Sequence, residues 1–122
     1  MSLALNPLLD VDYLTNFYGD DATIIHMIFD AFLSDSVPRW TSLKDAIETN
    51  DLASASSIVH GLKPSFTMSG LTATRQKVDA LEKQIKTQSA LSAIKSSYDD
   101  IDNDLKTLLP ILTSESARLK EL

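Results

Sequence analysis

Residues 91–112, LSAIKSSYDDIDNDLKTLLPIL, contain an apolar repeat that is typical of a helix in a bundle. The apolar side chains follow one another in alternating steps of three and four: Leu91, Ile94, Tyr98, Ile101, Leu105, Leu108 and Leu112. This spacing places one continuous stripe along one side of a helix. Such a stripe has to be covered, so we expect further helices to pack against it.

The rest of the chain also has the pattern of helices separated by short turns. A short helix is predicted over Val11–Phe17, ending at Gly19, and Asp20 is expected to cap a second helix that extends to about Thr49. After the turn at Asn50 and Asp51, a third helix is predicted to about Ser69, where Gly70 can end it, and a fourth over Thr72–Thr87. Pro38 and Pro110 are expected to kink the second and fifth helices.

Long amphipathic helices joined by short turns pack as antiparallel neighbours. The sequence therefore predicts an all-α fold, an antiparallel up-down four-helix bundle with a short extra N-terminal helix. We expect residues 1–122 to form a single domain, since this length is sufficient to bury a core.

Composition excludes several classes of function. The chain has no cysteine and two histidines, so we expect no metal site, disulfide or thiolate chemistry. The net charge of −6 argues against nucleic acid or an anionic membrane as partner. No apolar run approaches the roughly 20 residues of a membrane span, and no signal-peptide pattern is present, so we expect a cytoplasmic protein.

Residues 60–71, HGLKPSFTMSGL, contain the strongest functional signal. On a helical wheel of about 100° per residue, the apolar stripe of the third helix is formed by Ala55, Ile58, Val59, Leu62 and Phe66. His60 falls roughly 150° from the middle of this stripe and should face solvent. An exposed, neutral imidazole is a nucleophile at cytoplasmic pH, which indicates a carrier of phosphate.

The neighbours of His60 suit such a role. Lys63 lies one turn away, where its ammonium can favour a neutral imidazole and bind phosphate oxygens. The predicted binding surface around the histidine is formed by small or compact residues, namely Ser56, Ser57, Gly61, Pro64, Thr67 and Gly70. An exposed glycine costs a helix about 1 kcal/mol relative to alanine, and close access by another protein would explain its presence.

These residues resemble the motif of histidine-containing phosphotransfer (HPt) domains of two-component phosphorelays. That motif is His-x-x-Lys-Gly, a small residue, and a glycine ten positions after the histidine. His60, Lys63, Ser65 and Gly70 match it, with Leu62 and Leu71 at its hydrophobic positions, whereas Pro64 stands where the family usually has glycine. The departure affects local helix geometry and choice of partner.

The resemblance implies that His60 accepts a phosphoryl group at Nε2 and exchanges it with an aspartate of a response-regulator receiver domain. A sensor or hybrid histidine kinase is the other implied partner. The resemblance further implies a monomeric phosphocarrier that has no kinase activity and no cofactor, since the receiver supplies the Mg²⁺.

HPt domains also carry a Gln or Glu on the next helix that orients the histidine through Nδ1. Glu82 is predicted for this role from its distance along the chain, although a solvated glutamate is an equal alternative, and Gln76, Lys77, Lys83 and Lys86 are further contributors. His26 lies among apolar residues with no lysine three positions on, which favours a structural or surface role.

Two other functions fit the same sequence. A helical interaction module could have the HPt fold without phosphotransfer, but it should have lost His60 or Lys63. A histidine kinase needs a nucleotide-binding domain with glycine-rich loops, and this chain has three glycines, although it could be a fragment of a larger hybrid kinase.

Overall fold

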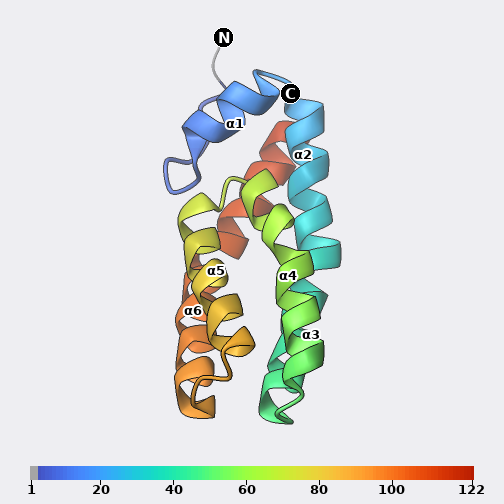
Figure 1. The fold of residues 1–122 in the computed structure, drawn as a ribbon. Coiled ribbons are helices and arrows are strands. Elements are labelled where there is room, and N and C mark those ends of the chain that lie inside the picture. Colours follow the sequence, from blue (N-terminus) through green and yellow to red (C-terminus); the bar gives the residue numbers. More distant parts are fainter. Residues whose placement is uncertain (1–2) are drawn as a thin grey trace.

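The computed structural model describes residues 3–122, which form an up-down bundle of helices with no strand in that range. Figure 1 shows the chain running down, up, down and up again, with α1 and the C-terminus near the same end of the bundle. The helices are α1 (Val11–Tyr18), α2 (Ala22–Ala31), α3 (Val37–Glu48), α4 (Leu52–Met68), α5 (Thr72–Lys86) and α6 (Leu91–Lys120). The predicted all-α four-helix bundle with a short N-terminal helix is confirmed.

One difference from the predicted second helix lies just before Pro38. The helical run from α2 to α3 passes through a π-helical turn, Phe32–Ser36, in which the Val37 N–H donates to the carbonyl of Phe32. Pro38 lies in the first turn of α3 and has no N–H to donate to the preceding turn, so a wider turn at this place is physically reasonable. By contrast, α4 and α6 continue through Pro64 and Pro110.

A second difference concerns the start of α2. Its N-cap is Asp21, whose carboxylate accepts from the N–H of Ile24 at 3.0 Å, so the expected cap at Asp20 was wrong by one residue. Either aspartate suits the position chemically, and the chain's exit from α1 through Gly19, at φ +61°, decides which one caps the helix.

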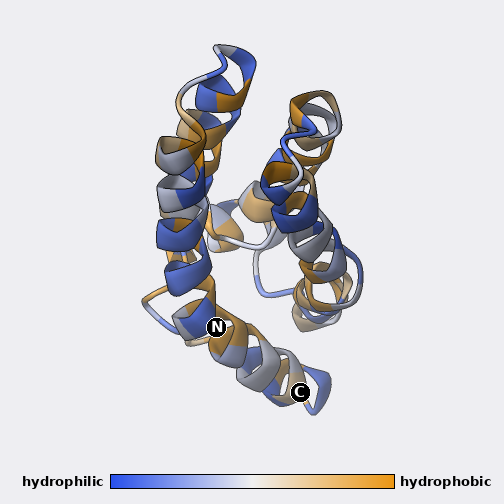
Figure 2. Ribbon diagram, turned by 90° about the horizontal axis from the view of Figure 1, so that it is seen from below, coloured by the Kyte–Doolittle hydropathy of each residue, from blue (hydrophilic) through white to orange (hydrophobic). Residues whose placement is uncertain are grey.

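The core lies between the four long helices, and the apolar residues gather on the sides that face one another (Figure 2). Its centre is aromatic: Phe66 of α4 contacts Phe32 and Trp40 edge-on, with ring centroids 5.2 and 6.2 Å apart. Trp40 stacks on Tyr98 of α6 at 4.2 Å and donates its indole N–H to Asp102. These contacts join α3, α4 and α6 at the middle of the bundle.

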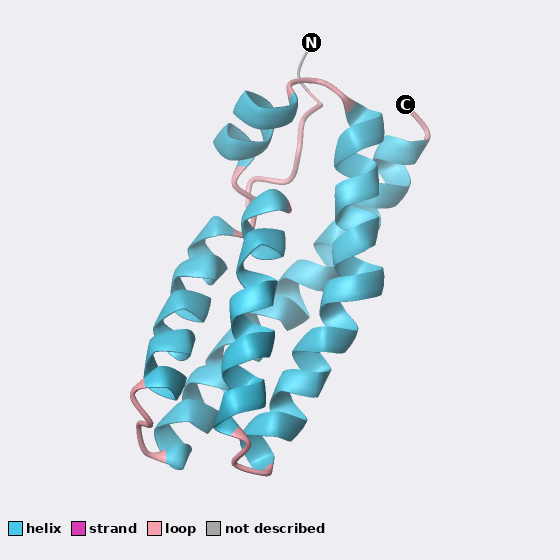
Figure 3. Cartoon of the chain, turned by 45° about the vertical axis from the view of Figure 1, so that its right-hand side comes forward, coloured by secondary structure: helices cyan, strands magenta, loops and turns pink. Residues whose placement is uncertain are grey.

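Helix α1 covers the end of the bundle at the turn between α4 and α5 (Figure 3). The backbone N–H of Asp10 donates to the carbonyl of Gly70, and the Thr72 hydroxyl donates to the Asp10 carboxylate. Gly70 has φ +75° and lies against the buried Leu14 of α1. The glycine that ends α4 therefore also makes room for α1.

Candidate functional site

His60 lies on the outer face of α4, opposite the buried residues of that helix. Its side chain is 69% exposed, whereas Val59 and Leu62 on either side are fully buried. Asp51 begins α4 as its N-cap, and Gly70 follows its end, so the predicted punctuation of this helix is observed. The apolar periodicity of α4 accordingly turns the imidazole to solvent.

A carboxylate on the neighbouring helix fixes the orientation of the imidazole. Glu82 of α5 is buried, and its Oε2 lies 2.9 Å from Nδ1 of His60. An ionised carboxylate can only accept a hydrogen bond, so Nδ1 must donate. In the neutral ring this leaves the lone pair on Nε2, which makes no hydrogen bond within residues 3–122.

Lys63 contacts the same carboxylate. Its Nζ lies 2.7 Å from Oε1 of Glu82 and 3.3 Å from Oδ1 of Asp79, and its side chain is 18% exposed. Lys86 approaches the other oxygen of Glu82 at 3.5 Å. Lys63 is thus committed to two carboxylates, and its direct effect is to hold Glu82 against His60.

The charges at this cluster support one another. Burial alone would raise the pKa of the Glu82 carboxyl, but the hydrogen bonds from Lys63 and His60 outweigh it and hold the pKa below its ordinary value. The hydrogen bond to Glu82 likewise raises the pKa of Lys63. Both groups therefore stay ionised across the physiological pH range.

Replacing Glu82 by glutamine is expected to lower the free energy of unfolding by about 1–2 kcal/mol at pH 7, because charge-assisted hydrogen bonds are lost. Since the pKa of Glu82 is lowered on folding, its contribution is complete above about pH 4.5 and disappears as the pH falls through the lowered value. Urea unfolding of wild type and Glu82→Gln, measured from pH 7 down into acid, should therefore give free energies of unfolding that converge at low pH.

Asp79→Asn is the matched control for that experiment, because Asp79 contacts Lys63 but not His60 and is half exposed. We expect it to change stability by less than about 1 kcal/mol. A constant difference between wild type and Glu82→Gln down to the lowest pH would contradict the role given to the Glu82 charge.

The residues predicted to surround His60 divide into two groups. Ser57, Gly61 and Pro64 are exposed, and Ser56 and Thr67 are half-buried. Gly70 is buried beneath Leu14, so its assignment to the binding surface was wrong: the position needs a positive φ and space for α1, and it does not face a partner. Thr67 accepts a hydrogen bond from Arg75, which ties it to α5.

Lys77, one of the predicted contributors, lies apart from His60, and two charged residues near the site were not predicted. Lys77 pairs with Asp100 and Asp104 of α6, on the far side of α5. Asp79 was not predicted, although its position three residues before Glu82 on one face of a helix is a signal that could have found it. Arg39 of α3 was also missed, and its guanidinium lies against Gly61.

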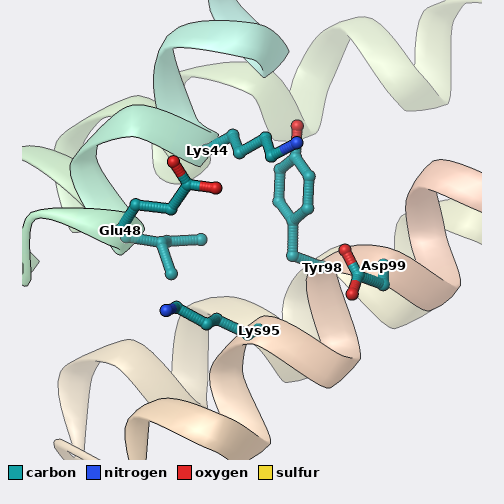
Figure 4. A pocket seen from close by; sticks show the side chains of 6 residues that line it. Lys44, Glu48, Lys95, Tyr98 and Asp99 are labelled. Atoms are coloured by element: carbon teal, nitrogen blue, oxygen red, sulfur yellow. The ribbon is translucent and has the colours of Figure 1, made fainter.

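Two further features lie away from this site. A pocket of about 220 Å³ between α3 and α6 is lined by Lys44, Glu48, Lys95 and Asp99, with the Tyr98 hydroxyl donating to the carbonyl of Trp40 (Figure 4). His26 joins α2 to α6: its Nδ1 lies 2.7 Å from the Ser116 hydroxyl, and its Nε2 lies 3.4 Å from Asp30.

Within residues 3–122, no three His, Cys, Asp or Glu side chains are grouped so that they could hold a metal ion. In the same range, no helix has the length and apolar character that crossing a membrane requires.

A family model described as "Hpt domain" matches residues 27–110, which include α3, α4, α5 and the cluster of His60, Lys63 and Glu82. No curated protein and no solved structure matches the chain significantly. The matched range covers more than half of the chain, and the observed helical bundle agrees with it. The chain therefore belongs to the family of Hpt domains.

Proposed function

We propose that this protein is a phosphocarrier of a two-component phosphorelay, and that His60 is its phosphoacceptor. The proposal rests on the state of the imidazole: the side chain of His60 is 69% exposed, and its Nδ1 is hydrogen-bonded to the buried Glu82. Membership of the Hpt family supports the same function, because its members carry phosphoryl groups between kinases and receiver domains.

In the proposed step, the lone pair of Nε2 attacks the phosphorus of an aspartyl phosphate on a receiver domain. A P–N bond forms, the P–O bond to the aspartate breaks, and its electron pair remains on the released carboxylate. The reverse step returns the phosphoryl group to an aspartate. Mg²⁺ bound by the receiver would supply charge neutralisation at the transferring oxygens, and the carrier's own residues contribute position and hydrogen bonds.

Glu82 and Lys63 act on this step through the ring. The Glu82 carboxylate accepts from Nδ1 and stabilises the positive charge that develops on the imidazole as the P–N bond forms. Lys63, at 2.7 Å from Glu82, keeps that carboxylate ionised and in place. We therefore assign Lys63 and Glu82 as positioning residues for His60.

The shape of the surface around His60 favours close approach by a receiver. Ser57, Gly61 and Pro64 are exposed and compact, so an active site recessed between loops can reach the imidazole without obstruction. We propose this face of α4, with the adjoining edge of α3, as the docking site for the receiver.

A direct test is transfer from phosphorylated receivers. Receiver domains loaded with radioactive acetyl phosphate and freed of the reagent are mixed with the protein, and acid-labile, base-stable label on the protein is measured over time. We expect label to move to the protein from at least one receiver. If a panel of receivers and small phosphoramidates all fail to label folded protein, it is instead a helical interaction module without phosphotransfer.

A further inference from the structure

Arg39 lies directly beside the residue that follows His60. A Cβ placed on Gly61 would be 2.5 Å from Nη2, 3.5 Å from Cζ and 3.8 Å from Nη1 of Arg39. The guanidinium therefore occupies the space that any other residue at position 61 would need for its side chain. Arg39 comes from α3 and is exposed.

Helix geometry places Arg39 and Glu82 on opposite flanks of His60. Successive residues of a helix are about 100° apart, so Gly61 faces one side of His60, and Lys63, three residues on, faces the other. Gly61 meets α3 through Arg39, and Lys63 meets α5 through Glu82. The imidazole stands between these flanks, with Nδ1 held on the α5 side.

The charges on the two flanks differ in a way that matters for an anion. On the α5 side, the ammonium groups of Lys63 and Lys86 are both paired with Glu82. For Arg39, the part of the chain from residue 3 to residue 122 provides no ion pair. Its planar fork of N–H donors is suited to the oxygens of a phosphoryl group.

We propose that Arg39 binds the oxygens of the phosphoryl group on His60, and that Gly61 is required because the guanidinium needs its space. The inference rests on the proposed phosphorylation of His60 and adds to it a residue from α3. When phosphoramidate is the donor, Nε2 forms a bond to phosphorus while the P–N bond of the donor, protonated on its nitrogen, breaks and neutral ammonia leaves with the electron pair. Throughout, Arg39 donates hydrogen bonds to the phosphoryl oxygens and takes no part in proton transfer.

The variants Arg39→Gln and Arg39→Lys test this assignment. Lys44→Gln, which removes an exposed cation roughly one and a half turns further along α3, is the matched control. The first readout is the rate of loading from phosphoramidate. We expect Arg39→Gln to be roughly two- to fivefold slower, the range for one exposed ion pair, with partial rescue in Arg39→Lys. Lys44→Gln should load like wild type.

The second readout responds only to contact with the phosphoryl group. A cation beside the phosphoryl oxygens favours their second ionisation. The ³¹P resonance of the phosphorylated protein should therefore titrate at higher pH in Arg39→Gln than in wild type or Lys44→Gln. Equal titration curves and equal loading rates in all these proteins would overturn the role of Arg39 while leaving His60 as acceptor.

A double-mutant cycle tests the pairing with Gly61. Gly61→Ala should displace the guanidinium and slow loading to a similar extent as Arg39→Gln, but it should have no further effect in the Arg39→Gln background. Additive effects of the two substitutions would overturn the proposed link. A wild-type protein that takes up no label would overturn the phosphocarrier function itself, and with it the role of Arg39.

Discussion

The His60→Gln variant is expected to take up no phosphoryl group from phosphoramidate under conditions that label the wild type. Glutamine can still accept or donate hydrogen bonds, but its amide nitrogen has no available lone pair to attack phosphorus. The imidazole is 69% exposed and contributes nothing to the core, so the variant should keep the helical content of the wild type. Phosphate-affinity electrophoresis and circular dichroism provide the two measurements.

His26→Gln is the matched control, because His26 is the other histidine of the chain. Its ring lies between α2 and α6, with Nδ1 on Ser116 and Nε2 near Asp30, and it contacts none of the residues around His60. We expect this variant to be labelled as wild type is. Label retained by His60→Gln and lost from His26→Gln would reverse the assignment of the acceptor.

Gly70→Ala is expected to lower the free energy of unfolding by about 2–5 kcal/mol. The backbone there has φ +75°, which costs a residue with a Cβ about 1–2 kcal/mol. The added Cβ would also lie 2.8 Å from Cδ1 and 2.9 Å from Cγ of Leu14, and crowding of this kind adds about 1–3 kcal/mol. Urea unfolding of the variant gives the change directly.

Gly19→Ala gives a comparison without crowding, because φ is also positive there, at +61°, and a Cβ would meet nothing within 4 Å. Gly19→Ala should therefore lose only a backbone contribution, which at φ +61° and ψ −128° is about 1–3 kcal/mol. A loss at Gly70 of no more than about 1–2 kcal/mol, the backbone contribution alone, would show that α1 is not packed against Gly70. In that case the account of how the turn after α4 is held would be wrong.

The arrangement of the helices could be predicted because its signals are local. The apolar repeat from Leu91 to Leu112, and the caps and glycines between helices, each depend on a few neighbouring residues. The same locality explains the errors. Whether Asp20 or Asp21 caps α2 depends on how the chain leaves Gly19. The π-helical turn at Phe32–Ser36, just before Pro38, leaves no mark in the apolar repeat.

The site was predictable to the extent that it lies on one helix. The wheel of α4 places His60 on the exposed face. The resemblance to HPt domains implied a partner on the next helix, and distance along the chain made Glu82 the candidate, with a solvated glutamate as an equal alternative. The pairing of Lys63 with Glu82, and the approach of Arg39 to Gly61, required knowledge of distances between helices. Gly61 did give a signal, an unexplained exposed glycine, but the sequence favoured access by a partner as its cause.

The most direct test of the central claim is to locate the phosphoryl group on the imidazole. Protein labelled with ¹⁵N-histidine is loaded with phosphoramidate, and the ¹⁵N and ³¹P resonances of the product show which ring nitrogen bears phosphorus. Because Nδ1 lies 2.9 Å from Glu82 and donates to it, we predict phosphorus on Nε2 of His60, with the proton retained on Nδ1. Phosphorus on Nδ1, or on His26, or no phosphohistidine in the folded protein would contradict the account.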